Sequence, residues 1–102
     1  MPTYIKVATI SQIAPGTGMV ANVNDKEVAV FNVDGTFYAI DNICKHRGGP
    51  LGEGELEGDT VTCPWHAWKY NVKSGNCLTK EGIKMDTYEV QVEGEDVNVA
   101  IP

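Results

Sequence analysis

Two short motifs bring together residue types that bind transition metals. Cys44 and His46 are separated by one residue, Cys63 and His66 by two, and sixteen residues, 47–62, lie between the motifs. The motifs contain both histidines of the chain and two of its three cysteines. Thiolate and imidazole are suitable ligands for zinc, copper and iron–sulfur centres. The pattern therefore predicts a metal site with one Cys and one His from each of two loops.

A structural zinc site with two cysteines and two histidines is the plainest metal interpretation. Zinc fingers, however, usually place their cysteines close together and their histidines close together. Here each pair is mixed, and residues 48–58 contain five of the eleven glycines. Glycine lets a backbone approach a ligand closely and turn its N–H groups inward. The segment is therefore either a flexible surface loop or a loop whose backbone is shaped around a metal.

The elements that must position these loops are expected to be β-strands. The chain has 12 Val, 7 Ile and 8 Thr but only 3 Leu, and β-branched residues favour pleated sheets. Asp34-Gly35 predicts a tight hairpin, because glycine accepts a positive φ. No strong helix is expected. Predicted strands cover residues 4–7, 19–23, 27–33, 36–40, 60–62, 69–71, 88–92 and 96–100.

Charge and hydropathy exclude several classes of protein. The net charge is −6 with a single Arg, Arg47, so nucleic-acid binding is not expected. No apolar run is longer than Val28–Phe31, which predicts neither a membrane span nor a secretory signal. The expected location is the cytoplasm. An odd number of cysteines in a reducing compartment argues against a disulfide framework, leaving a metal site, a reactive thiol or inert buried thiols.

The segments CKHRGGPL (residues 44–51) and CPWHAWKY (63–70) resemble those of Rieske-type [2Fe–2S] proteins. The resemblance implies an all-β fold, with an antiparallel β base domain and an inserted cluster-binding subdomain over about 43–78, within a single domain over 1–102. It also implies one [2Fe–2S] cluster. Cys44 and Cys63 would bind one iron, and His46 and His66 the other.

This mixed ligation has an electrostatic purpose. Two ferric ions, two sulfides and two thiolates sum to zero formal charge, so adding an electron requires less work than with four thiolates. Rieske potentials accordingly lie at about −150 to +300 mV, against roughly −400 mV for plant-type ferredoxins. Gly49 and Trp65 replace the disulfide cysteines of high-potential respiratory relatives, and Trp68 replaces a serine that donates to sulfide. These departures indicate the soluble, low-potential branch.

Four further positions near the motifs have expected roles. Tyr70 either directs its hydroxyl to sulfur or fills the core beneath the cluster. Ile83 or Met85, in the third loop 79–85, replaces the family's shielding proline. Cys77 is expected to be a buried inert thiol.

Two groups of residues concern contact with partners. Trp65 either walls off the cluster, which is the favoured role, or forms an exposed docking surface. The acidic residues alternating over 53–59 either steer a basic partner or keep an exposed strand soluble.

The resemblance implies a soluble one-electron carrier rather than an enzyme. It would pass electrons from a flavoprotein reductase to a terminal oxygenase, as an electron-transport ferredoxin. The alternative is the small subunit of an NAD(P)H-dependent nitrite reductase, working with its large subunit. A self-contained oxygenase is excluded because no His remains for a second iron site. The chain is expected to be a monomer whose partners dock over His46 and His66, with Lys45, Arg47, Pro64 and Trp65 as the contact rim.

Overall fold

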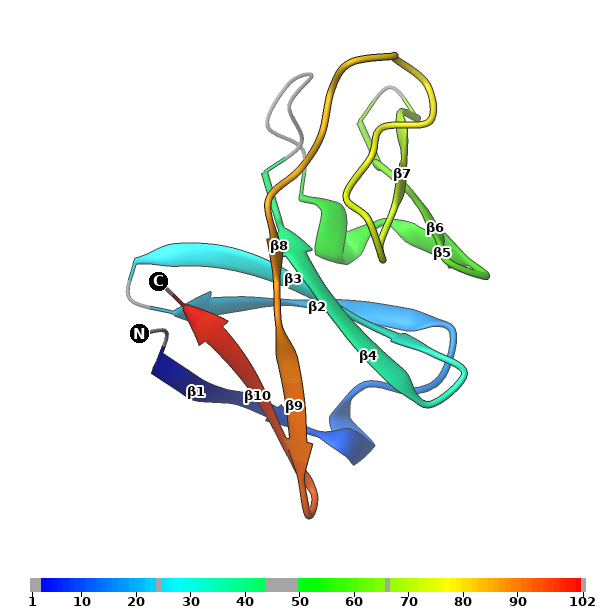
Figure 1. Ribbon diagram of the computed structural model, residues 1–102. Coiled ribbons are helices and arrows are strands. Elements are labelled where there is room, and N and C mark those ends of the chain that lie inside the picture. The colour runs from blue at the N-terminus through cyan, green and yellow to red at the C-terminus, as the bar shows by residue number, and fades with distance from the viewer. Residues whose placement is uncertain (1–2, 24, 44–49, 66, 102) are drawn as a thin grey trace.

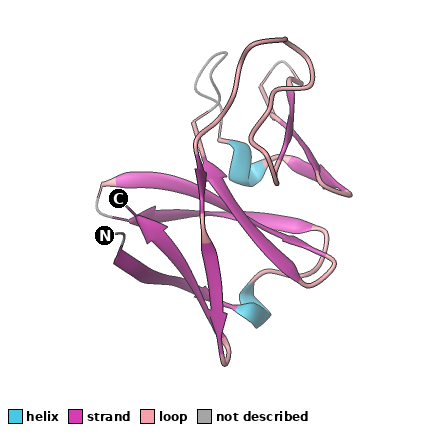
Figure 2. Ribbon diagram, in the orientation of Figure 1, coloured by secondary structure: helices cyan, strands magenta, loops and turns pink. Residues whose placement is uncertain are grey.

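The structure is a computed structural model that describes residues 3–23, 25–43, 50–65 and 67–101. Its regular structure consists of antiparallel strands and two short 3-10 turns, which confirms the all-β prediction (Figure 2). The strands are β1 Thr3–Thr9, β2 Thr17–Val23, β3 Lys26–Val33, β4 Thr36–Asp41, β5 Glu55–Glu57, β6 Thr60–Thr62, β7 Lys69–Asn71, β8 Thr87–Tyr88, β9 Val90–Glu93 and β10 Asp96–Ile101. The 3-10 turns are η1 Ile10–Gln12 and η2 Leu51–Glu53.

The strands form three sheets (Figure 1). The first has the order β1-β10-β9, the second β2-β3-β4-β8, and the third β5-β6-β7. The third sheet lies in sequence between β4 and β8, so it is an insertion into the strands of the other two. The limits of about 43–78 for a cluster-binding subdomain, and a single domain over 1–102, stay predictions.

The second sheet is buried on both faces, because alternate residues of β3 belong to different apolar cores. Val28 and Val30 pack in one core with β1 and β10, whereas Ala29 and Phe31 pack in another with β6 and β7. This burial explains why β3 is an unbroken apolar run rather than an alternating one. The second sheet is thus the middle layer on which the inserted sheet rests.

Turn chemistry sets the predicted hairpins. Asp34 and Gly35 both have positive φ, 51° and 92°, and the Gly35 N–H donates to Asn32 Oδ1 at 2.7 Å. This is the two-residue turn that fits the right-handed twist of its strands. Gly94, at φ 62°, makes the corresponding turn between β9 and β10. The Asp34-Gly35 turn lies where the sequence predicted it.

One predicted strand is wrong in an informative way. The sequence predicts a single strand over residues 88–92, but the strand is interrupted at Glu89, which separates β8 from β9. Tyr88 in β8 pairs with Ala39 of β4, while Val90 in β9 pairs with Val99 of β10. The segment therefore changes from the middle sheet to the outer sheet, a tertiary event that local alternation does not encode. In the part of the chain that is described, no helix is long and apolar enough to cross a membrane.

Candidate metal centre

Of the four predicted ligands, the structure describes only Cys63. Cys44, His46 and His66 lie outside the described residues. The structure does describe the segments on either side of these three. The two ligand motifs can therefore be analysed from Cys63 and from the points where each loop leaves and rejoins the fold.

Cys63 follows the last residue of β6, at the start of a short connection to β7. The Cys63 N–H donates to the Trp68 carbonyl at 2.7 Å, which closes the connection across five positions. Ala67 has φ 59°, a conformation uncommon for a residue other than glycine. Beneath the connection, Lys69 Nζ donates to Thr62 Oγ1 at 3.0 Å. The second ligand motif is thus held on a hairpin with a bonded base.

The residues on either side of the first ligand loop are paired with each other. Ile43 and Pro50 form an isolated antiparallel bridge, and the Leu51 N–H donates to the Asn42 carbonyl at 2.8 Å. Leu51 and Cys63 are both fully or almost fully buried members of the same apolar core. The base of the first loop and the base of the second therefore share one core, below the end of the molecule formed by the inserted sheet (Figure 1).

That core consists of residues from the middle sheet, the inserted sheet and the segment after it. Tyr70 is fully buried there, which confirms that it fills the core, while its direction toward a cluster sulfur stays a prediction. Met85 is also fully buried and Ile83 packs against the same core, while shielding of a cluster by either residue stays a prediction.

Cys77 is buried, as expected for an inert thiol. Its N–H donates to the Ile83 carbonyl at 2.9 Å, and its Sγ accepts the Lys80 N–H at 3.3 Å. Cys77 forms a bridge with Tyr70, on β7, which separates it from β6 and Cys63. These bonds give the thiol a structural role in anchoring the third loop.

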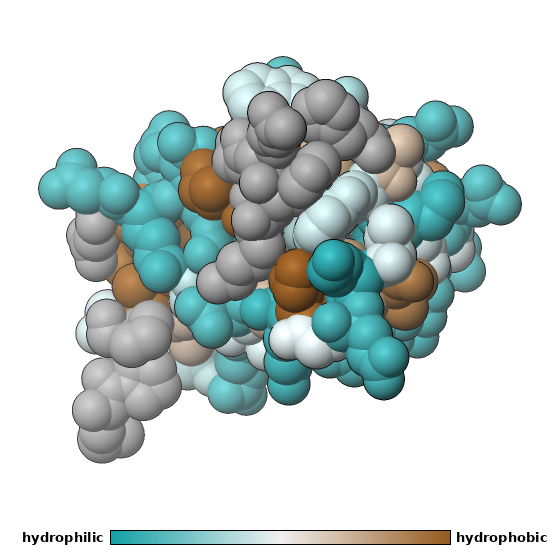
Figure 3. All heavy atoms as spheres, turned by 90° about the horizontal axis from the view of Figure 1, so that it is seen from above, coloured by the Kyte–Doolittle hydropathy of each residue, from teal (hydrophilic) through white to brown (hydrophobic). Residues whose placement is uncertain are grey.

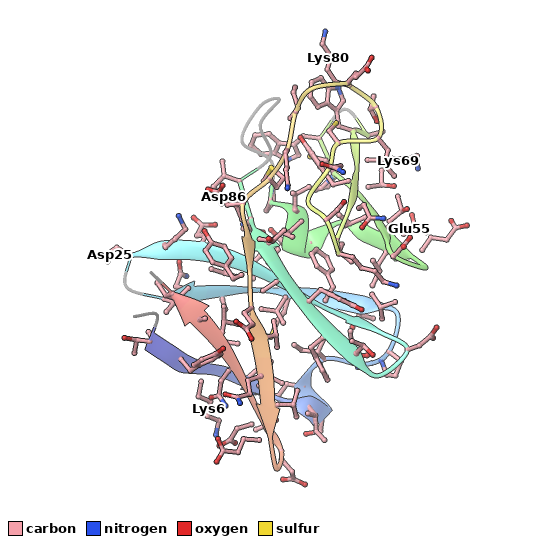
Figure 4. The ribbon with its side chains drawn as sticks, viewed as in Figure 1. Lys6, Asp25, Glu55, Lys69, Lys80 and Asp86 are labelled. Carbon is pink, nitrogen blue, oxygen red and sulfur yellow. The ribbon has the colours of Figure 1, made fainter. Side chains whose placement is uncertain are left out.

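The exposed surface at this end differs from the expectation. Trp65 is 51% exposed, so the structure favours the docking alternative over the wall that the sequence suggested. Ile43 and Leu78 are exposed as well, at 43% and 56%, which the sequence did not indicate. Seen from above, apolar side chains lie among polar ones on this end (Figure 3). Lys80 projects from the outer end of the third loop (Figure 4).

A hollow of about 500 Å³ lies beside Cys63. Its lining includes Cys63 and Pro64 together with the carboxylate-bearing Glu53 and Glu55. Negative charge next to a reducible centre opposes the addition of an electron, so these carboxylates would act in the direction of the predicted low potential. Glu55 extends outward from β5 (Figure 4), so solvent screens part of its effect. The acidic residues of β5 thus lie on an exposed edge strand.

The described part of the predicted donor set, the Cys63 sulfur, fits a thiolate-bound iron–sulfur group. The described residues by themselves contain no group of three possible metal ligands, and their one predicted ligand is a buried sulfur. Soft thiolate ligands select copper(I), zinc and iron–sulfur centres. A buried thiol at the mouth of a bonded hairpin, above an apolar core, suits such a group. The remaining three ligands would have to come from residues 44–49 and 66.

Comparison with known proteins agrees with this donor chemistry. The model of the Rieske [2Fe-2S] domain matches residues 3–99. The biphenyl dioxygenase ferredoxin subunit of a Pseudomonas species is 33% identical over 99 residues, covering 95% of this chain and 91% of that protein. Such relatives are electron-transfer subunits rather than catalytic enzymes. This confirms the prediction from the sequence that the chain is an electron-transfer component and not an enzyme.

Solved structures give the same result. In a complex of reduced oxygenase and oxidized ferredoxin of carbazole 1,9a-dioxygenase, the matching chain has a TM-score of 0.88 and 34% identity, over 95% of this chain and 92% of that one. A nitrite reductase small subunit from Mycobacterium tuberculosis has a TM-score of 0.91 but 21% identity, over 100% and 97%, and shows the fold alone. With its antiparallel sheets, its buried Cys63 and this match over 3–99, the chain belongs to the Rieske [2Fe–2S] domain family.

Proposed function

We propose that this chain is a ferredoxin that binds one [2Fe–2S] cluster through Cys44, His46, Cys63 and His66. It would carry single electrons from a flavoprotein reductase to a terminal oxygenase. The observation that carries the proposal is the buried Cys63 on its bonded hairpin, over the core that also holds the base of the first loop. The relatives named ferredoxin components of dioxygenase systems support the same role.

When bound, the cluster supplies reversible one-electron transfer at nearly constant ligand geometry. The chain's own residues hold that geometry. The Cys63 N–H bond to the Trp68 carbonyl and the Ile43–Pro50 bridge fix the bases of the two loops. The fully buried Leu51 and Met85 exclude water from below. A rigid, dry base keeps structural rearrangement small when the charge of the centre changes, and this favours fast transfer.

The surface for partners is the end that bears the ligand motifs. Electron transfer falls off steeply with distance, so a partner must come close to the two His. Trp65, Ile43 and Leu78 offer exposed apolar area there. Lys45 and Arg47 add positive charge according to the sequence. Redox encounters bury under about 1,200 Å², so a small apolar patch with charged neighbours suffices.

We also place the protein in the cytoplasm as a monomer. A reducing compartment suits a chain whose three cysteines are assigned to ligation and packing rather than to disulfides. The buried thiol of Cys77, with its bonds to Lys80 and Ile83, fits this assignment.

The first experiment measures iron and acid-labile sulfide per chain, and the EPR spectrum of the dithionite-reduced protein. Two irons, two sulfides and a Rieske-type signal are expected for one cluster. Zinc without sulfide in a colourless protein would overturn the proposal and favour the structural zinc site.

The second experiment separates the partners. Stopped-flow reduction by a flavoprotein reductase, followed by reoxidation by a terminal oxygenase, is expected to be fast. Lys45→Glu combined with Arg47→Glu should slow the partner reaction at low salt and leave the midpoint potential almost unchanged. Reoxidation by a sirohaem nitrite reductase but not by any oxygenase would replace the oxygenase partner with the nitrite reductase large subunit.

A further inference from the structure

We propose that Asn42 is a positioning residue that closes the base of the first ligand loop, and so determines how firmly Cys44 and His46 are held. The inference rests on the proposed function, because the loop matters as a ligand loop only if a cluster binds there. It adds a residue outside both ligand motifs. Asn42 lies two positions before Cys44, directly after the last residue of β4.

Asn42 bonds both ends of the loop at once. It is fully buried, and its main-chain carbonyl accepts the Leu51 N–H at 2.8 Å. Its side-chain Oδ1 accepts the next amide along, the N–H of Gly52, at 2.7 Å. One residue therefore receives two consecutive N–H groups from η2, which starts directly after the loop. Ile43 follows Asn42 in the chain, and Leu51 and Gly52, beyond the loop, are bonded to it.

The same residue is anchored to the middle sheet on its other side. The Asn42 N–H donates to the Glu27 carbonyl at 3.2 Å, and Nδ2 donates to Glu27 Oε1 at 2.9 Å. Glu27 is an exposed residue of β3, so its carboxylate reaches over the sheet to a buried amide. Asn42 thus links β3 to η2 through a side chain that both accepts and donates, which an apolar residue of similar size cannot do.

Gly52 shows how little freedom η2 has to adapt. A Cβ at position 52 would lie 2.7 Å from the Met19 carbonyl oxygen and 2.7 Å from Val20 Cγ2. The turn is therefore pressed against β2 on one side and bonded to Asn42 on the other. If the Asn42 side chain is removed, the Gly52 N–H loses its acceptor.

A second buried asparagine provides a matched control. Among the described residues, Asn32 and Asn42 are the two buried polar ones. Asn32 also uses both side-chain atoms, with Nδ2 donating to the Ile13 carbonyl at 2.7 Å and Oδ1 accepting the Gly35 N–H at 2.7 Å. Its bonds hold the β3–β4 turn, away from the ligand motifs in the sequence. Loss of either side chain should destabilise the fold similarly, and only Asn42 should affect the cluster.

The experiment compares Asn42→Ala, Asn32→Ala and wild type as purified holoproteins. We measure thermal unfolding, the rate at which a strong iron chelator bleaches the visible absorption, the EPR g-values and the midpoint potential. Hydrogen exchange of the Leu51 and Gly52 amides reports the base of the loop directly. We expect similar losses of thermal stability in both variants. In Asn42→Ala alone, bleaching should be about tenfold faster, the g-values should shift and the Gly52 amide should lose protection.

A second pair of variants avoids any failure to fold, because Glu27 is exposed. Glu27→Ala should speed bleaching in the same direction but by a smaller factor. Glu27→Gln keeps the acceptor oxygen and should restore the wild-type rate. Equal bleaching rates and g-values in Asn42→Ala and Asn32→Ala, or wild-type behaviour in Glu27→Ala, would overturn the inference and leave the proposed function intact. A wild-type chain without iron and sulfide would instead overturn the proposed function.

Discussion

Gly54→Ala places a methyl group where the backbone of two elements meets. Gly54 follows η2 with φ −76° and ψ 166°, a conformation that alanine adopts without strain. Its added Cβ, however, would overlap the Thr62 carbonyl oxygen and lie 3.1 Å from Val61 Cγ2. Thr62 directly precedes Cys63. The substitution therefore tests whether close packing of η2 against β6 holds the sulfur ligand in place.

The expected loss of stability in Gly54→Ala follows from the kind of atoms that the new methyl group would meet. Because a backbone oxygen is in the way, the two elements must separate, and such overpacking costs about 1–3 kcal/mol. For a chain of this length, about 1 kcal/mol lowers the midpoint of thermal unfolding by roughly 4 °C. Gly54→Ala should thus lower it by about 4–12 °C.

Gly58→Ala is the matched control in the same hairpin. Gly58 has φ 62°, and no atom lies within 4 Å of the Cβ that alanine would add. Alanine there should cost about 1–2 kcal/mol from backbone conformation alone. The two variants therefore lose comparable stability for different reasons. Only the clash at Gly54 pushes on the Thr62 carbonyl.

The assay follows unfolding by far-ultraviolet circular dichroism and the cluster by EPR and visible absorption. Gly54→Ala should shift the g-values and shorten the lifetime of the cluster, whereas Gly58→Ala should leave both unchanged. A Gly54→Ala protein that unfolds at the wild-type temperature would refute the close approach itself. Identical cluster spectra in the two variants would show that η2, and not β6, moves to absorb the methyl group.

Further predictions concern the ligands and one hydroxyl group. His46→Cys or His66→Cys should lower the midpoint potential toward roughly −400 mV, since a thiolate is added, and unchanged potentials and g-values in both would refute the assignment. Cys77→Ser should keep its iron, so iron loss would make Cys77 a ligand. Trp68→Ser should raise the potential when its hydroxyl donates to sulfide, and a lowered potential on redox titration contradicts this. Tyr88→Phe should change the unfolding temperature little, because the Tyr88 hydroxyl makes no hydrogen bond of good geometry among the described residues and Lys26, which lies over the ring, still packs on phenylalanine; a clear decrease counts against this.

Much of the fold could be predicted from local signals, because it depends on neighbours in sequence. Asp34-Gly35 formed its turn where positive φ was expected, and β6 and β7 have the predicted bounds. The strand break at Glu89 could not be predicted, because it is set by β4 and β10, which are distant partners. The donor set of the site follows from residue types and spacing, and it stays a prediction for Cys44, His46 and His66. The exposure of Trp65 was not, since it depends on how other segments pack around it.

One feature beneath the site could not be predicted from the sequence: the middle sheet contributes residues to two apolar cores, one on each face. Because alternate residues of β3 serve different cores, any displacement of the middle sheet strains both of them. The residues at the bases of the two ligand loops, Leu51 and Cys63, pack on the face that holds Phe31. A change of charge at the proposed cluster therefore acts against a layer that is fixed from behind by β1 and β10. A small chain gains in this way the stiffness that keeps rearrangement during electron transfer low, and the buried bonds of Asn42 extend that stiffness to the first loop.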